Sequence, residues 1–319
     1  MSNKHLFVVD PINNLNLKLD TSMHFAKSLI QHGQYCFITN IEKISWISKN
    51  RYPHAMVRQL KFSPTSSQIS LSEEKKVSID DFKTIHIRKE PPVNYNYLHT
   101  TLLLENAPKE TIVLNSPRAL RDYNEKITPL LFPQHSIKTL ISYSEKEIYR
   151  FLDEFSLKKI ILKPMNLFSG KGIIALDKSK DSKEFIESSI QQITKNGQQP
   201  IIIQEFLDEI YQGELRVFTA RGKCISWAKK VPAQGNFLAN TRNGASLEPY
   251  SPEKSLVDMV EKITKELYKK GIYYTGIDII KDKISEINIT SPRLLCVKEN
   301  PEQAFAKLAE DLLDFIDKK

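Results

Sequence analysis

The sequence is poor in cysteine and lacks the long apolar runs of a membrane protein. Its three cysteines are far apart and in no C-x-x-C spacing, so neither a disulfide framework nor a structural zinc site is predicted. No stretch approaches 18 apolar residues, and the start, MSNKHLFVVDP, has an apolar run too short for a signal peptide. These absences predict a cytoplasmic protein without a membrane-spanning segment.

Signatures of several function classes are also missing. The seven histidines do not cluster and no H-E-x-x-H spacing is present, which argues against a histidine-built metal site. A net charge of +8 suggests an anionic partner, but the lysines are scattered and often alternate with acids. Since no RNA-recognition signature or finger spacing is found, we expect a small phosphate- or carboxylate-bearing molecule as the partner rather than nucleic acid.

The chain has the composition of a globular protein and a length that predicts more than one structural unit. It is 40% apolar and 26% charged, and its 319 residues exceed the size at which a single core usually stops growing. The order HLFVVDP, DTSMHFAKSLIQHG, YCFITN is strand, helix, strand, which predicts an α/β unit with a parallel sheet. We expect an α/β and α+β fold with three units, namely residues 1–124, a small α+β unit at 125–200, and residues 201–319, a sheet covered by two helices.

The stretch GIDIIKDKISEINITSP, residues 276–292, is a hydrophobic hairpin that carries three unexpected polar residues. Folded about Asp282, it places Asp278 opposite Glu286, while Asn288 projects from the same side as Glu286. Two opposed carboxylates destabilise a sheet, and the hairpin offers no basic residue on that face. A divalent cation would balance the charge, and three such oxygen ligands suit Mg²⁺. The alternative is a polar, solvent-facing side of an edge hairpin.

Two lysines occupy positions from which they could reach a phosphate. Lys163 ends the apolar strand of IILKP, just before a turn in which the backbone of Ser169 and Gly170 can approach a phosphate closely. Lys126, in LRDYNEK, lies where the first two units join. The alternatives are a surface lysine at a strand end and a solvated hinge lysine.

An arginine is placed on a strand that leads toward the hairpin. Arg216 alternates with apolar neighbours in QGELRVF. On the face that carries the polar hairpin residues, it could stabilise charge that develops on a transferring phosphate or on an oxyanion. A simple ion pair with Glu214 is the alternative interpretation.

Six blocks of sequence carry a resemblance to a known family. In unbroken order over about residues 5 to 315, they are VVDPINNLNLKLDTS, IRKEPPVNYNY, LNSPRALRDYNEK, IILKP, GELRVF and YTGIDIIKDKISEINITSP. Together they resemble the bacterial glutathione synthetases, a family of the ATP-grasp superfamily. The resemblance implies an ATP-grasp fold with an N-terminal parallel-sheet domain.

The resemblance also implies an activity, namely an ATP-dependent carboxylate-amine ligase that joins γ-glutamylcysteine to glycine. The substrate carboxylate would take the γ-phosphate of ATP to give an acyl phosphate, from which the amine displaces phosphate. Such chemistry depends on positioning and charge neutralisation, which fits the lack of a plausible Ser-His-Asp set. The implied partners are ATP, a dipeptide and an amino acid, with no nucleic acid or membrane, in a homo-oligomer of two or four chains.

Roles for matching positions follow from the resemblance. The ATP phosphates would be held by Lys126 and Lys163, together with Ser169 and Gly170 of the turn. The adenine and ribose would meet Glu205, Phe206, Leu207 and Glu214. The metal ligands, for Mg²⁺ or alternatively Mn²⁺, would be Asp278, Glu286 and Asn288. The carboxylate and its acyl phosphate would be handled by Arg88 and Arg216. The substrate side of the cleft would include Asp10, Asn13, Lys230, Asn236, Ser291 and Arg293.

The sequence departs from the family pattern mainly at the acceptor side and in the segments that cover the cleft. The turn after KP is NLFSG instead of D-G-M-G-G, and the loop VPAQGNFLANTRNG is shorter and lacks the arginine before its GN. Lys230 stands where the family has arginine, and Arg293 replaces a smaller or polar residue. Two alternatives therefore stay open: an ATP-grasp ligase with a changed amino acid or peptide substrate, and a non-catalytic nucleotide- or nucleic-acid-binding module.

Overall fold

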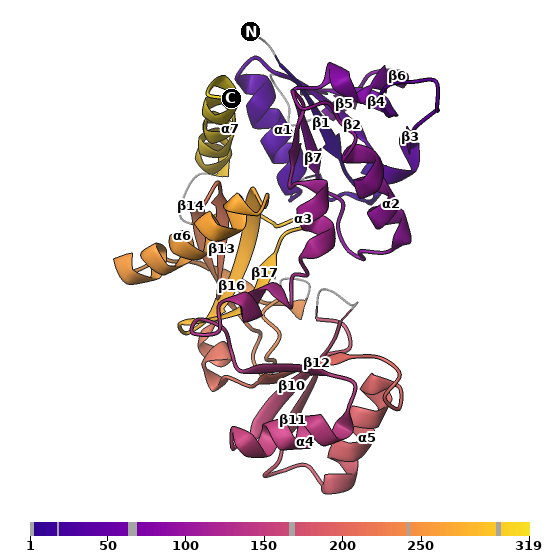
Figure 1. Cartoon of the computed structure of the whole chain (residues 1–319). Coiled ribbons are helices and arrows are strands. Elements are labelled where there is room, and N and C mark those ends of the chain that lie inside the picture. Colours follow the sequence, from indigo (N-terminus) through magenta and orange to yellow (C-terminus); the bar gives the residue numbers. More distant parts are fainter. Residues whose placement is uncertain (1–2, 18, 63–68, 166–169, 241–242, 298–300) are drawn as a thin grey trace.

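The computed structural model describes residues 3–17, 19–62, 69–165, 170–240, 243–297 and 301–319. Three sheets follow one another along the molecule: an N-terminal sheet, a five-stranded sheet and a four-stranded sheet (Figure 1). The five-stranded sheet, formed by the C-terminal portion of the chain, lies between the other two. Among the described residues, no helix is long and apolar enough to cross a membrane.

The N-terminal sheet is mixed, with a parallel portion where the sequence predicted one. Strands β2, β1, β7 and β8 are parallel neighbours, while β4 pairs antiparallel with β2. The full order is β3-β4-β2-β1-β7-β8, and β5 and β6 also pair with β4. The strands are β1 (Lys4–Val8), β2 (Tyr35–Thr39), β3 (Ile44–Ser45), β4 (His54–Phe62), β5 (Ile69–Leu71), β6 (Lys75–Ser78), β7 (Thr84–Ile87) and β8 (Ile112–Leu114).

Helices of the N-terminal unit begin at side chains that cap them. Asp20, Asn94 and Ser116 each accept a hydrogen bond from the backbone N–H three residues on, which satisfies one of the unpaired donors of a helix start. The helices are α1 (Thr21–Gln31), α2 (Tyr95–Leu104) and α3 (Pro117–Asp122), and the 3₁₀ turns are η1 (Ile12–Asn14), η2 (Ile41–Lys43) and η3 (Ile79–Asp81).

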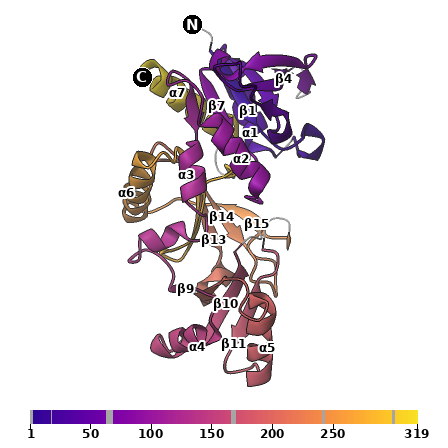
Figure 2. The same ribbon diagram turned by 45° about the vertical axis from the view of Figure 1, so that its right-hand side comes forward.

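The four-stranded sheet is antiparallel and has its own core. Its order is β11-β10-β12-β9, and two helices pack on one face (Figure 2). Its buried apolar residues form a cluster separate from those of the other two sheets. This unit therefore does not share an apolar core with the rest of the molecule. Its elements are β9 (Thr139–Ser142), α4 (Glu145–Glu154), β10 (Lys159–Pro164), β11 (Ile174–Asp177), α5 (Lys183–Thr194) and β12 (Ile201–Glu205).

The five-stranded sheet is also antiparallel, in the order β15-β14-β13-β16-β17. Helix α6 packs on it, whereas α7 packs on α1 as well as on β14. The prediction that both C-terminal helices cover this sheet holds for α6 and only in part for α7, whose apolar face packs into a core shared by the N-terminal unit and the five-stranded sheet. The elements are η5 (Asp208–Gln212), β13 (Glu214–Ala220), β14 (Lys223–Val231), β15 (Ser246–Pro249), α6 (Lys254–Lys269), β16 (Tyr274–Ile280), β17 (Lys283–Asn288) and α7 (Pro301–Asp317).

The connection between the N-terminal and four-stranded sheets runs along β17. The N–H of Ile287 donates to the carbonyl of Glu125, and the N–H of Ile284 donates to the carbonyl of His135. The 3₁₀ turn η4 (Thr128–Leu131) lies in this connection. Residues 125–137 thus border the five-stranded sheet, and the division into units at residues 124/125 and 200/201 stays a prediction.

The hairpin of β16 and β17 has the predicted pairing at its polar end. Asp278 is opposite Glu286 and Gly276 is opposite Asn288. Nearer the turn the register shifts by one residue, so that Ser285 is an extra residue on β17. Only Lys281 and Asp282 lie between the strands, whereas a symmetric hairpin about Asp282 would also place Lys283 in the turn.

Candidate functional site

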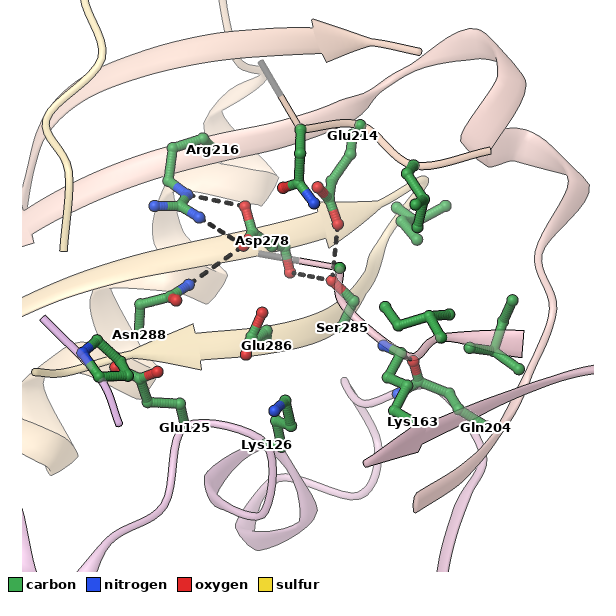
Figure 3. A pocket seen from close by; sticks show the side chains of 18 of the residues that line it. Glu125, Lys126, Lys163, Gln204, Glu214, Arg216, Asp278, Ser285, Glu286 and Asn288 are labelled. Atoms are coloured by element: carbon green, nitrogen blue, oxygen red, sulfur yellow. Dashed lines mark hydrogen bonds and ion pairs between the residues drawn. The ribbon is translucent and has the colours of Figure 1, made fainter. Parts of the chain in front are cut away.

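A cavity of about 410 Å³ lies between the four-stranded and five-stranded sheets and extends to the N-terminal unit. Its wall includes residues of β10, β12, β13, β14, β16 and β17, the start of the connection at residues 123–126, and two loops at residues 237–240 and 290–295. Polar and apolar groups both line it, as expected of a site for a small polar ligand. The predicted hairpin residues lie on its floor (Figure 3).

Two cations balance the charge of Asp278. Arg216 of β13 is its direct cross-strand neighbour and donates from Nε to Oδ1 at 2.8 Å and from Nη2 to Oδ2 at 2.7 Å. Lys230 of β14 donates from Nζ to Oδ1 at 2.7 Å. Asp278 is only 3% exposed, and burial would raise its pKa, but the two positive charges outweigh burial and hold the pKa below its ordinary range.

This geometry corrects the sequence-based account of the charge. The hairpin alone contains no basic residue beside Asp278, yet β13 and β14 bring two from positions 48 and 62 residues away. The alternative pairing of Arg216 with Glu214 is also wrong, because Glu214 instead pairs with Lys230, whose Nζ is 2.5 Å from Oε2. Asp278 is therefore anchored by the protein before any ligand binds.

Glu286 has different surroundings. Burial raises the pKa of its carboxyl to about 7, and the charges of Glu125 and Asp278 add to the rise, while Lys163 and Lys126 act in the opposite direction. In the described portion of the chain, no side chain donates a hydrogen bond to this carboxyl. A buried carboxyl of this kind is stabilised by a bound cation.

The set formed by Glu286 and Asn288 fits a hard divalent cation. Asn288 donates from Nδ2 to the carbonyl of Gly276 at 2.9 Å and to Oδ2 of Asp278 at 3.1 Å, so its Oδ1 is the atom left to coordinate a metal. Among the described residues, no three His, Cys, Asp or Glu side chains form a metal-binding group alone. A cation here would hence take the rest of its oxygen ligands from phosphate and water, as Mg²⁺ commonly does.

The two predicted lysines lie beside Glu286, across the cavity from Asp278 (Figure 3). Lys163 is held by Gln204, whose Oε1 accepts from Nζ at 2.7 Å, and burial lowers its pKa despite the opposing charges of Glu286 and Glu214. Lys126 donates to the carbonyls of Pro164 and Met165 at 3.2 and 3.3 Å. The structure thus brings the two lysines to the same wall.

The predicted phosphate turn and adenine segment also reach the cavity. Gly170 lines it, while Ser169 lies outside the described residues. Glu205, Phe206 and Leu207 line it where the chain leaves β12. Isoleucines from neighbouring elements make this end of the cavity largely apolar.

The substrate-side predictions divide into two groups. Lys230, Ser291 and Arg293 line the cavity, whereas the others lie outside its lining: Asp10, Asn13, Arg88 and Asn236.

Three of the residues outside the lining have local partners or exposure instead. Asp10 accepts from the backbone N–H of Glu90 and pairs with Lys89 at 2.8 Å. Asn236 caps its own loop by accepting from the N–H of Leu238 at 2.9 Å, and Asn13 is exposed.

Arg88 lies behind the cavity wall. Its guanidinium is buried and donates to Oγ of Ser22 at 3.1 Å and to the carbonyl of Pro292 at 2.7 Å. It therefore fixes the backbone beside Arg293 and does not face the cavity as the direct handling of a substrate carboxylate would require.

Three residues of the site were missed in the sequence. Gln204, a polar residue in the apolar run PIIIQEF, was the one with a visible signal, because a strand-buried amide needs partners. Ser285 enters through the bulge, where it donates to Oε1 of Glu214 at 3.0 Å. Glu125 accepts three hydrogen bonds at one oxygen, from the backbone of Ile289 and from the backbone and hydroxyl of Thr290. Neither of these two roles is visible before the strands are placed.

Comparison with known proteins covers nearly the whole chain. Residues 4–121 match the family model of the prokaryotic glutathione synthetase N-terminal domain, and residues 125–303 match that of the prokaryotic glutathione synthetase ATP-grasp domain. The glutathione synthetase of Buchnera aphidicola subsp. Baizongia pistaciae is 30% identical over 315 residues, which is 98% of this chain and 94% of the relative. That of Synechococcus elongatus is 31% identical over 301 residues, 91% of each chain.

Solved structures share the fold at low sequence identity. The crystal structure of D-cycloserine synthetase DcsG superimposes with a TM-score of 0.66 at 14% identity and covers 97% of this chain and 99% of that one. The macrocyclase MdnC, bound with precursor peptide MdnA, gives a TM-score of 0.62 at 17% identity, with coverage of 97% and 99%. These likenesses concern the fold, while the family models and sequence relatives cover both halves of the chain. The chain therefore belongs to the prokaryotic glutathione synthetase family and has the ATP-grasp fold.

Proposed function

We propose that this ATP-dependent, peptide-bond-forming ligase binds ATP along the cavity and transfers the γ-phosphate to a substrate carboxylate beside Glu286. The observation that carries the proposal is that two lysines, the buried carboxyl of Glu286 and the guanidinium of Arg216, which is hydrogen-bonded to Asp278, all line one cavity. The apolar residues where the chain leaves β12 lie at one end of this cluster, and the segment at residues 290–295 lies at the other. That order corresponds to base, phosphates, reacting centre and substrate.

The phosphate end would be held by charge. Lys126 and Lys163 would contact the ATP phosphates, and Glu286 and Asn288 would hold a divalent cation, for which we propose Mg²⁺ rather than Mn²⁺. When bound, the cation would neutralise phosphate oxygens during transfer. Asp278 would contribute mainly by fixing Arg216 and Asn288, to both of which it is hydrogen-bonded.

Arg216 is placed to stabilise the reacting groups. Its Nε and Nη2 are used by Asp278, and Nη1 lies over Gly276, where an added Cβ would come within 3.1 Å of it. Because glycine has no side chain there, the guanidinium can lie close to the backbone of β16. We propose that it faces the acyl phosphate and then the tetrahedral oxyanion as the amine attacks.

For the substrates we propose γ-glutamylcysteine and glycine. The family match supports this choice, and Ser291 and Arg293 at the far end of the cavity would meet the small substrates. Arg293 is also the observation that favours a second candidate, a changed acceptor, because it adds a charge to that end. A cytoplasmic location and a homo-oligomer stay predictions.

One assay tests the proposal. Purified protein is incubated with Mg-ATP, γ-glutamylcysteine and glycine, and both phosphate release and product mass are followed. We expect release that depends on both substrates, with a product of the mass of glutathione. Release only with another acceptor would move the assignment to the second candidate. No release with a broad panel of acceptors would contradict the ligase reaction itself.

A further inference from the structure

The loop that follows β14 lies at the nucleotide end of the cavity. By resemblance the stretch VPAQGNFLANTRNG belongs to the acceptor side, but in its described part, residues 232–240, Phe237 contacts Phe206. The two ring centroids are 5.8 Å apart and the rings are inclined by 66°, an edge-to-face arrangement. Phe206 is the residue where the chain leaves β12, so the contact joins the loop to the apolar end of the cavity.

A second contact fixes the same loop against the phosphate turn. A Cβ built on Gly170 would come within 2.8 Å of Nδ2 of Asn240 and 3.4 Å of Cδ1 of Leu238. Gly170 has φ +76°, a conformation that glycine adopts without strain. Two separate points of the loop are thus packed on residues that follow β10 and β12, the strands that carry Lys163 and Gln204.

Phe237 is only half-buried, although it is a large aromatic residue in the cavity wall. Its edge-to-face partner Phe206 contacts the ring, and Phe237 lines the same cavity as Ile161 and Leu207. A purine base has two flat faces that pack well on aromatic and aliphatic side chains. The wall at this end offers such side chains from three elements, of which the loop supplies the aromatic one.

We propose that Phe237 packs against the base of the bound nucleotide, and that the loop of residues 232–240 belongs to the nucleotide site. This inference rests on the proposed function, because it assumes that ATP occupies the cavity with its base at the apolar end, where the chain leaves β12. It assigns to the loop a role in nucleotide affinity that does not depend on which amine is the acceptor.

Calorimetric titration of the full chain in magnesium buffer tests the assignment with two probes, ATP and inorganic tripolyphosphate. Phe237→Ala removes the contact between the aromatic ring and the base, so ATP binding should weaken on the order of tenfold. Tripolyphosphate binding should stay unchanged, because tripolyphosphate has no base. Phe237→Tyr keeps the ring and should keep the affinity for ATP. Thermal unfolding of each variant checks that the fold is intact.

Tyr211→Ala is the matched control. The Tyr211 ring lies 6.0 Å from that of Phe206 but does not line the cavity, so this variant also removes a ring contact to Phe206 and should bind ATP like the unaltered protein. The assignment is wrong if Phe237→Ala binds ATP normally, if it loses ATP and tripolyphosphate equally, or if Tyr211→Ala loses as much. If the unaltered protein does not bind ATP, whether or not it binds tripolyphosphate, both the proposed function and this inference are wrong.

Discussion

Asp278 and Glu286 face each other across two strands, yet their surroundings shift their pKa values in opposite directions. Arg216 and Lys230 keep the pKa of Asp278 low, whereas burial and nearby carboxylates raise that of Glu286 to about 7. Pairs of titratable groups separated in this way usually have different tasks. Here Asp278 holds Arg216 and Asn288 in place through hydrogen bonds. Glu286 is the carboxyl whose charge a bound cation would stabilise.

The first prediction concerns Glu286. In Glu286→Gln the side chain keeps its size but loses the charge that a divalent cation needs, so kcat should fall at least about a hundredfold. The melting temperature should not fall, because a neutral amide replaces a buried carboxyl whose charge is costly to bury. Phosphate release and thermal unfolding measure the two effects, with the surface variant Glu187→Gln as control. Ordinary activity with normal magnesium dependence would contradict the role.

The second prediction concerns Lys230. In Lys230→Met, Glu214 loses its cation and Asp278 keeps only Arg216, so the free energy of unfolding should fall by about 3 kcal/mol. The double variant Lys230→Met/Glu214→Gln removes the uncompensated charge and should recover most of that loss. Urea unfolding of the three proteins gives the values. A double variant no more stable than the single one would show that the pair is not coupled.

At the scale of elements, strand geometry decides which side chains reach the site. The one-residue bulge in β17 turns Ser285 toward Glu214 and the backbone of Asp278. Glu286 therefore follows a serine that holds the carboxylate of Glu214 and the backbone of Asp278. A regular hairpin with the same sequence would direct Ser285 to the opposite face of the sheet.

Strands β1 and β7 carry a buried polar chain of a different kind. Nδ1 of His5 is 2.7 Å from Oγ1 of Thr84, which is 2.8 Å from Nε2 of His86. Burial lowers the pKa of His5 to about 4 even though Gln34 opposes it. Burial and the charges of His5 and Arg88 hold the pKa of His86 well below its ordinary value. Both histidines are neutral in the folded protein at neutral pH.

The third prediction follows from these histidines. Above about pH 6.5, His5 and His86 are neutral in both the folded and the unfolded protein. Below that pH these histidines bind protons in the unfolded chain but stay neutral in the folded protein. The free energy of unfolding therefore falls as the pH drops from about 6.5 toward 4. Each histidine should contribute about 1.4 kcal/mol per pH unit in that window. Urea unfolding of His5→Gln should give a correspondingly smaller slope between pH 6 and 5 and an unchanged slope between pH 7 and 8. Equal slopes at acid pH would contradict it.

At the scale of the whole molecule, the N-terminal and five-stranded sheets act as one support for the substrate end. The segment Ile289–Leu294 follows β17 and is held from outside its own sheet. Asn115 donates to the carbonyl of Ile289, Arg88 to that of Pro292, and Leu294 donates its N–H to Oγ1 of Thr21. The four-stranded sheet has a separate core. Lys163 thus belongs to a unit whose apolar core is separate from the one beneath β17 and Glu286.

The fourth prediction tests the support by removing Arg88. In Arg88→Met the buried carbonyl of Pro292 loses its donor, which should lower the free energy of unfolding by about 2 kcal/mol. KM for the carboxylate substrate should rise about tenfold, since a displaced substrate segment loses alignment. The Kd of ATP should stay within about twofold, because Lys163 is held by Gln204, and Lys126 donates to the carbonyls of Pro164 and Met165. Arg118→Met, at a side chain that is 79% exposed, is the control. A rise in the Kd of ATP equal to that in KM would contradict the division of roles.

Local patterns in the sequence were enough for several features of the structure. Folding GIDIIKDKISEINITSP about Asp282 placed Asp278 opposite Glu286, because the centre of the turn fixes which residues of an antiparallel hairpin face each other. The strand, helix, strand order at the start predicted the parallel pairing of β1 and β2. Motif blocks indicated the family that the comparisons confirm. Each of these features depends on neighbours within a few tens of residues.

Contacts between distant segments could be decided only by the folded chain. The order β14-β13-β16-β17 brings Lys230 and Arg216 to Asp278, and no local rule fixes which strands become neighbours across an intervening helix. Arg88 is turned behind the wall because the segment after β17 crosses it, and Phe237 lies at the nucleotide end because its loop packs on Gly170 and Phe206. The charge balance and the shape of the cavity depend on contacts between side chains that are far apart in the sequence. Arg88 and Pro292, for example, are separated by 204 residues.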